Sequence, residues 1–280
     1  MDKIYDVMEM LLPFNWVEYA FMKNALLGVL IIAPLFGILG TMIVNNKMAF
    51  FSDALGHSAL TGVAIGSLLG IIDSNIITTA FAIIFALLLN RIKRRSSMST
   101  DTVISAFSSF VVAVGLMILS RGGNFAKYSS LLVGDILSIS IIDIRSLAII
   151  LLGTITFWIL AFNKLHAVGV NRSLARSKGI NCSLVEDSFS VLLAIIVMFS
   201  IKWVGLLIIN ALLILPAAAS RNISVNMREY HLFSVMISIF SAVTGLVVSY
   251  YIGTATGPTI VIFASIIFFL TLFIGPNKCN

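Results

Sequence analysis

Charged residues are scarce in this sequence of 280 residues. Asp, Glu, Lys and Arg make up 11% of the positions. The hydrophobic residues Ala, Val, Ile, Leu, Met, Phe, Trp, Tyr and Cys together make up 59%. The mean hydropathy is +1.08. A water-soluble domain of this length needs more charged residues on its surface, so the composition excludes a water-soluble protein. The apolar residues form continuous runs, unlike the alternating segments of a transmembrane β-barrel. The sequence therefore predicts an all-α polytopic membrane protein without a soluble domain.

Several sequence signatures of catalysis are also missing. No G-x-x-x-x-G-K-[ST] segment is present, so the chain carries no nucleotide-hydrolysing motif of that type. No H-E-x-x-H segment is present, which excludes the simplest intramembrane metalloprotease. Cys182 and Cys279 are far apart and form no CxxC pair, so we interpret them as reduced thiols. The acidic N-terminal segment MDKIYDVMEM predicts no cleaved signal peptide.

A single transmembrane domain of about eight or nine helices is predicted over residues 1–280, since most apolar runs approach the ~20 residues that a span needs. The predicted spans are 24–44, 54–72, 76–90, 102–120, 144–162, 188–201, 203–219, 231–251 and 259–274. The count is eight if 188–219 is one helix broken around Lys202. The run 129–140 is too short and too polar to span, and residues 5–19 predict an interfacial helix.

Lys and Arg in the short loops predict the orientation of the chain. The densest basic clusters are RIKRR at 91–95 and the segment 164–178. Both lie on the cytoplasmic side if an even number of spans separates them, and 102–120 and 144–162 supply two. This arrangement places the N-terminus outside and the C-terminus inside. The net charge of +6 then reflects cytoplasmic loops, and no nucleic-acid partner is expected.

The segment FFSDALGHSAL at 50–60 places an acid and an imidazole within an apolar run. Asp53 and His57 are separated by one helical turn, so they share one face of a helix. With a boundary at the turn 45–47, His57 lies on the order of 15 Å along the helix, about half of a ~30 Å hydrocarbon core. Because charge at this depth is costly, the pair predicts a functional site. A pair that only braces helix packing is the alternative.

The chemistry of these two side chains favours a transition metal. Carboxylate and imidazole suit Zn²⁺, Mn²⁺ or Fe²⁺ better than Ca²⁺ or Mg²⁺, which prefer oxygen ligands alone. Asp53 and His57 do not close a site by themselves. A second copy of the chain on a two-fold axis would complete a set of four ligands.

Two further segments indicate contact surfaces. Small residues recur at every fourth position after His57 and predict a ridge for close helix packing: Ser58, Gly62, Gly66 and Gly70. Within the polar loop 164–187, the segment NRSLARSKGI predicts a short helix that is capped at Asn171 and ends at Gly179. The residues alone leave open whether this basic helix contacts a partner protein or anionic lipid.

Six segments, in this order, resemble one family. They are MAFFSDALGHSALTGVAIG (48–66), STDTVISAF (99–107), LLVGDILSIS (131–140), LARSKGI (174–180), IKWVGLLIINALLILPAAASR (201–221) and GPTIVIFAS (257–265). Together they resemble the membrane permease subunits of metal-ion ABC importers of the ABC-3 type. These are the zinc and manganese permeases that receive metal from cluster A-I solute-binding proteins. The resemblance covers nearly the whole chain, and the D-x-x-x-H helix is its most diagnostic part.

The resemblance implies a fold similar to permeases of vitamin B12-type (type II) importers, in a bacterial plasma membrane. It implies a homodimer with a pore on the two-fold axis, two cytoplasmic ATPase subunits that use ATP, and an extracellular metal-binding protein that delivers Zn²⁺ or Mn²⁺, with Fe²⁺ also admitted. The chain itself is then a transport subunit, not an enzyme, and holds no permanent cofactor.

The family's pore ligands fall on Asp53 and His57, and its coupling helix, which contacts the ATPase, falls on about 171–180. The expected contact residues are Asn171, Arg172, Leu174, Ala175, Arg176, Gly179 and Ile180. Many relatives have Asp and Glu at the positions of Asn171 and Ser173, and Gly at that of Ser52. The alternative function is an ATP-independent divalent cation channel or secondary transporter, in which the same pair relays protons or cations.

Overall fold

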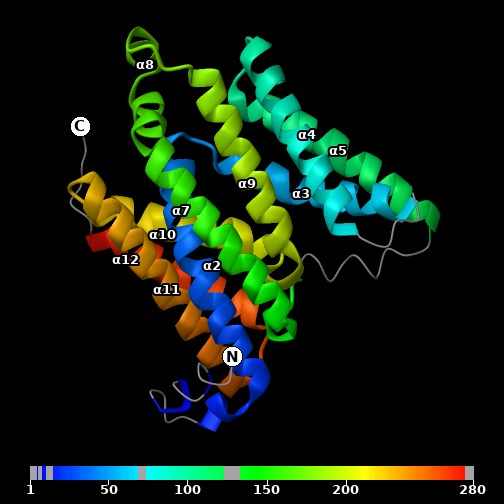
Figure 1. The fold of residues 1–280 in the computed structure, drawn as a ribbon, viewed down its shortest axis with the longest axis vertical. Coiled ribbons are helices and arrows are strands. Elements are labelled where there is room, and N and C mark those ends of the chain that lie inside the picture. Colours follow the sequence, from blue (N-terminus) through cyan, green and yellow to red (C-terminus); the bar gives the residue numbers. More distant parts are fainter. Residues whose placement is uncertain (1–4, 6–7, 11–14, 69–73, 123–132, 275–280) are drawn as a thin grey trace. The chain divides into compact units, whose positions relative to one another are not determined.

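The computed structural model describes residues 5, 8–10, 15–68, 74–122 and 133–274 (Figure 1). Every regular element in this part of the chain is helical, as the composition predicted. The elements are η1 (Asn15–Glu18), α2 (Ala20–Asn45), α3 (Ala49–Leu68), α4 (Ser74–Arg95), α5 (Thr100–Gly122), η2 (Ile136–Ser138), α7 (Ile141–Val170), α8 (Arg172–Ser177), α9 (Cys182–Val204), α10 (Leu206–Ile223), α11 (Met227–Ile252) and α12 (Thr256–Ile274).

The predicted spans correspond to α2, α3, α4, α5, α7, α9, α10, α11 and α12. In the part of the chain that the structure describes, seven of these helices are long and apolar enough to cross a membrane: α2, α4, α5, α7, α9, α11 and α12. The helix α10 is a shorter apolar helix, and α3, which corresponds to the expected span 54–72, is not among the seven. The runs 76–90 and 188–201 are short, but flanking polar residues extend α4 to 22 residues and α9 to 23 residues. Residues 188–219 form two helices, and the break lies at Gly205, where φ is 81°, rather than at Lys202.

Two shorter predictions have different outcomes. Residues 129–132 lie outside the described residues, and within 134–140 the regular element is the three-residue helix η2, which is too short to span. Asp135 caps this helix by accepting from the amide of Leu137 at 3.1 Å. The prediction of an interfacial helix over 5–19 is wrong for residues Asn15–Glu18. These residues form a 3₁₀ turn, and Trp16 is buried rather than exposed at an interface.

The chain divides into two compact units. The first contains Met1–Gly40, Val133–Leu152 and Trp203–Asn280. In this unit α10, α11 and α12 pack against one another. The hydroxyls of Ser234 and Ser238 on α11 donate to the carbonyls of Gly37 and Ala33 on α2, both at 2.7 Å. These bonds join helices far apart in sequence, and buried hydroxyls are satisfied by helix carbonyls.

The second unit contains Thr41–Leu132 and Gly153–Lys202. Here α3 packs against both α4 and α5, which lie beside it in Figure 1. A Cβ atom at Gly62 of α3 would lie 3.0 Å from the Cα of Thr78 on α4. On another side of α3, Thr61 donates from its hydroxyl to the carbonyl of Val111 on α5 at 2.7 Å. Two neighbouring helices therefore fix the position of α3.

Candidate functional site

Asp53 and His57 lie one turn apart on α3, which begins at Ala49 directly after a tight turn. Lys47 in that turn has a φ of 55°, a left-handed conformation that reverses the chain between α2 and α3. The Nε2 atom of His57 is 3.6 Å from Oδ2 of Asp53. Their side chains are 37% and 49% exposed, respectively. Both groups are thus directed away from the core of their unit and are open to a ligand.

These two side chains face a broad hollow, which we call the α3–α5 groove, with a volume of about 1000 Å³. One wall is the exposed face of α3 and the other is the exposed face of α5. Its lining residues are Phe50, Asp53, Ala54, His57, Asp101, Thr102, Ile104, Ser105, Ala106, Ser108, Ser109, Val112, Ala113 and Leu116. Hydroxyl groups are concentrated on the α5 wall, opposite the carboxylate and imidazole, so the groove offers oxygen and nitrogen donors to a cation.

The metal-binding capacity of one chain is limited. Among the residues that the structure describes, no group of three or more His, Cys, Asp or Glu side chains is arranged to hold a metal ion. If Asp53 and His57 bind a metal ion, they offer two ligands, and further ligands would have to come from hydroxyls, water or a second chain. An open, incompletely coordinated site holds an ion weakly, which suits passage better than permanent storage.

The ridge of small residues lies on the buried side of α3, away from the groove. Ser58, Gly62 and Gly66 are buried. Gly62 allows the backbone of α4 to approach closely, and the hydroxyl of Ser58 donates to the carbonyl of Leu55 at 2.7 Å. Gly70 lies outside the described residues. Sequence reasoning did not identify Gly115 of α5, which provides the equivalent close contact against Thr61 on another side of α3.

The segment 171–180 forms the short helix α8 with the predicted caps. The Oδ1 atom of Asn171 accepts from the amides of Ser173 and Leu174, at 2.9 and 3.1 Å. At the other end Gly179 adopts a φ of 76°, and the amide of Ile180 donates to the carbonyl of Ala175 at 3.1 Å. This is the left-handed glycine ending that the sequence predicted.

The side chains of α8 divide into an anchoring face and an exposed face. Ala175 is 1% exposed and packs in an apolar cluster with Val168 and Cys182. Ile180 is partly buried against this cluster. The expectation that Ala175 contacts a partner is therefore wrong, because the side chain is enclosed by its own unit. The expected contact residues Asn171, Arg172, Leu174, Arg176 and Gly179 are exposed.

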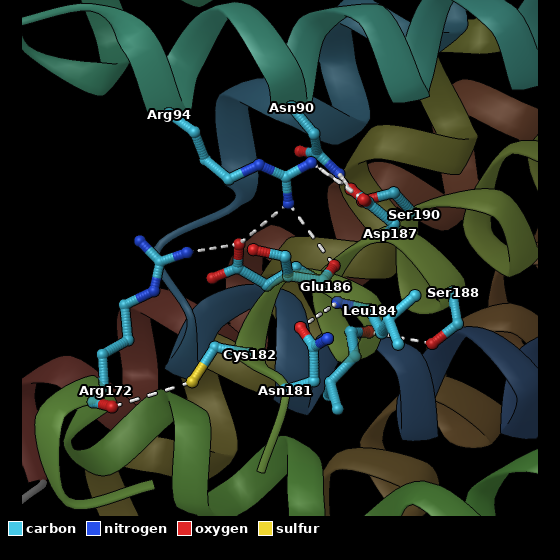
Figure 2. Close-up of polar contacts among 12 residues, drawn as sticks. Asn90, Arg94, Arg172, Asn181, Cys182, Leu184, Glu186, Asp187, Ser188 and Ser190 are labelled. Carbon is cyan, nitrogen blue, oxygen red and sulfur yellow. Dashed lines mark hydrogen bonds and ion pairs between the residues drawn. The ribbon is translucent and has the colours of Figure 1, made fainter. Parts of the chain in front are cut away.

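Sequence reasoning missed a network of charged side chains beside α8. Figure 2 shows the guanidinium of Arg94, at the end of α4, between two carboxylates of α9. The Nη2 atom of Arg94 donates to both oxygens of Asp187, at 2.9 and 2.8 Å, and Nη1 lies 3.9 Å from Glu186. Glu186 also forms an ion pair with Arg172 of α8. The sequence does contain a feature that could have indicated this network. Glu186 and Asp187 lie near the start of an apolar helix, where charged side chains are costly unless they are paired.

This network also tests the predicted topology. It joins the RIKRR segment, through Arg94, to the loop 164–187, through Arg172. Both basic clusters therefore lie at the same end of this unit, as the loop charges predicted.

The long apolar helices define a multi-pass membrane protein, in which an open groove carries a carboxylate and an imidazole and a short basic helix is exposed. The chain belongs to the ABC 3 transport family, whose sequence model matches residues 18–275. It is 32% identical over 254 residues to the high-affinity zinc uptake system membrane protein ZnuB of Haemophilus influenzae, covering 89% of this chain and 95% of ZnuB. It is 25% identical over 262 residues to the manganese transport system membrane protein MntC of Listeria monocytogenes, covering 94% and 93%.

A solved structure has the same fold. PsaBC from Streptococcus pneumoniae, in complex with Fab, matches with a TM-score of 0.82 at 24% sequence identity, over 99% of this chain and 98% of that chain. The family and the helices together make this chain a multi-pass permease of the bacterial plasma membrane. It falls among the metal-ion permeases of ABC importers, as its sequence motifs indicated.

Proposed function

We propose that the chain is the membrane subunit of an ATP-driven importer of Zn²⁺ or Mn²⁺, and that Asp53 and His57 bind the ion in transit. One observation carries this proposal. In a chain of the ABC 3 transport family, a carboxylate and an imidazole 3.6 Å apart face an open groove between α3 and the long apolar helix α5. Both ligand types suit these two metals, and Fe²⁺ satisfies the same chemistry.

The groove supports a homodimer with the pore between the two copies. Charged and hydroxyl side chains that face hydrocarbon are costly, so the α3–α5 groove requires a polar or protein surface opposite it. In a symmetric dimer the same surface of each copy meets on the two-fold axis. Two grooves would then enclose one channel, and the two Asp53–His57 pairs would supply four ligands, the number that Zn²⁺ prefers.

ATP hydrolysis belongs to separate cytoplasmic subunits, because the sequence has no nucleotide-binding motif of the P-loop type. The exposed face of α8 offers these subunits an apolar contact at Leu174, which is 55% exposed, next to the cation of Arg176. An extracellular binding protein delivers the metal to the outer mouth. ATP-driven closure of the ATPase pair then moves α8 and changes the side to which the groove opens.

Measurement of metal uptake by cells tests the proposed ligands. In a deletion strain, cellular zinc, manganese and iron are measured by mass spectrometry after complementation with wild type, Asp53→Ala or His57→Ala, at matched expression. Glu18→Ala and His231→Ala are the controls, because they remove an acid and a histidine that do not line the groove. We expect wild type and both controls to restore one metal, and neither ligand variant to restore it.

The outcome separates the ligand role from the transport class. Full restoration by Asp53→Ala and His57→Ala would make the pair a packing element and place the ion pathway elsewhere. Uptake that persists after deletion of the ATPase gene would refute the ATP-driven mechanism and favour a channel or secondary transporter. The metal that changes in the wild-type comparison identifies the substrate.

A further inference from the structure

We propose that Arg94, Glu186 and Asp187 are positioning residues that couple α8 to the metal-binding helix α3. This inference rests on the proposed function, since it assigns the route by which movement at the ATPase contact reaches the groove. Three sets of contacts between helices, which we call joints, connect α8 to the α3–α5 groove, and all of them lie within the second unit. Each joint is formed by different contacts, so each can be tested separately.

The first joint fastens α8 to the start of α9. The apolar cluster of Val168, Ala175 and Cys182 holds the inner face of α8. On its outer side Arg172 forms an ion pair with Glu186, whose side chain is only 15% exposed. An apolar contact and a charged contact on two sides of so short a helix resist both its tilting and its sliding. A displacement of α8 should therefore carry the first turns of α9 with it.

The second joint is a set of polar contacts between the start of α9 and the end of α4. Arg94 and Asp187 are joined by two short hydrogen bonds, and their side chains are 23% and 25% exposed. One turn earlier on α4, the buried Asn90 donates from Nδ2 to Asp187 at 3.0 Å and to Ser190 at 2.8 Å. Charge-assisted hydrogen bonds fix distance and orientation more narrowly than apolar contacts do. The ends of α4 and α9 are thus held in a defined register.

The third joint fastens α4 to α3. At Gly62 the two helices approach so closely that a Cβ atom would lie 3.0 Å from Cα and 3.2 Å from Cγ2 of Thr78. Close-packed helices transmit displacement because no compressible space separates them. A movement of α4 therefore shifts α3, and with it the Asp53 and His57 side chains. Glu186 lies at the centre of this path, since it pairs with Arg172 on one side and with Arg94 on the other.

A hollow of about 450 Å³ lies beside the first two joints. Its lining includes Arg172, Glu186, Asn46, Lys47 and Asp101. Because this space is not filled by side chains of the unit, α8 has room to move on that side. The ion pairs then provide the direct connection from α8 to α4 around the hollow.

The test uses the complete importer, with its ATPase and binding protein, in proteoliposomes. Uptake of zinc and of manganese is measured together with ATP hydrolysis, and the ratio of metal imported to ATP hydrolysed is the readout. The main variant is Arg94→Gln, with Arg94→Lys as the conservative replacement. Arg95→Gln is the matched control, because it removes the same charge from an exposed position at the same helix end.

We expect Arg94→Gln to assemble and hydrolyse ATP, but to import about fivefold less metal per ATP or worse, the lower end of typical coupling factors between linked sites. Arg94→Lys should recover part of the ratio, and Arg95→Gln should match wild type. Arg172→Gln should also lower the ratio. The double variant Arg172→Gln/Arg94→Gln should lose no more than the single variant with the larger loss, because the Arg172–Glu186 and Arg94–Asp187 contacts lie in series on one path.

An unchanged ratio in Arg94→Gln would refute the coupling role, and so would additive losses in the double variant. If Arg94→Gln does not insert into the membrane, Glu186→Gln replaces it, since this change keeps the shape of the side chain and removes its charge from both ion pairs. A wild-type complex that imports metal without ATP would refute the proposed function instead. The two failures are therefore distinguishable.

Discussion

A side chain at Gly115 should force α5 away from α3. A Cβ atom at this position would overlap the hydroxyl of Thr61 and would lie 2.9 Å from its Cα and 3.1 Å from its Cβ. Backbone cannot move aside as the end of a flexible side chain can, so the helices must separate. Separation also breaks the hydrogen bond from Thr61 to the carbonyl of Val111, which is 2.7 Å long.

The expected cost of Gly115→Ala combines two effects. Overpacking costs about 1–3 kcal/mol, and an interhelical hydrogen bond in a membrane protein contributes about 0.6 kcal/mol on average and at most about 1.7. The better helix propensity of alanine offsets roughly 0.5–1 kcal/mol of these two costs, so we expect a net destabilisation of about 1–4 kcal/mol. Thr61→Val removes only the hydrogen bond, so it should cost only the hydrogen-bond contribution of about 0.6 kcal/mol. The melting temperature of the purified protein in detergent measures both.

Gly153→Ala is the matched control, because no atom lies within 4 Å of a Cβ atom at that position of α7. Alanine is a better helix former than glycine by roughly 0.5–1 kcal/mol, so this variant should melt at the wild-type temperature or slightly above it. If Gly115→Ala and Gly153→Ala have the same melting temperature, α5 does not approach α3 as closely as described. The walls of the groove would then be less firmly fixed than we infer.

Two further predictions concern the sites themselves. Asn171→Ala should remove the cap of α8 and destabilise it by about 0.5–2 kcal/mol, which should weaken co-purification of the ATPase; Asn171→Asp, which keeps a capping oxygen, should retain it. His57→Asn keeps a polar side chain but removes the imidazole nitrogen that suits a transition metal, so it should raise the metal concentration needed for half-maximal uptake. An unchanged concentration would contradict a ligand role for His57.

The helices and their local features could be predicted because they depend on neighbouring residues. Continuous apolar runs indicated each span, and Asp53 and His57 share a face because the helical repeat places them there. The caps of α8 follow from a side-chain oxygen at Asn171 and from glycine at position 179, whose backbone tolerates a positive φ. Each of these features is settled within one or two turns of helix.

The contacts between distant segments could not be predicted in the same way. Arg94 and Asp187 are 93 positions apart, and RIKRR predicted only the side of the membrane on which the loop lies. The hydroxyls of Ser105 and Ser109 recur along α5, but the sequence does not say which helix this face approaches. Their place opposite His57 depends on the close contact at Gly115, which requires the tertiary arrangement.

The way α3 is held explains how it can present two polar side chains to an open groove. Gly62 fixes the helix against α4, and Thr61 with Gly115 fixes it against α5. Neither contact uses Asp53 or His57, so the position of α3 does not depend on the ionisation or metal occupancy of the pair. Because packing on two sides stabilises the helix, the third side is free to keep an incomplete ligand set. A site that is held in place but left incomplete can accept an ion and release it again.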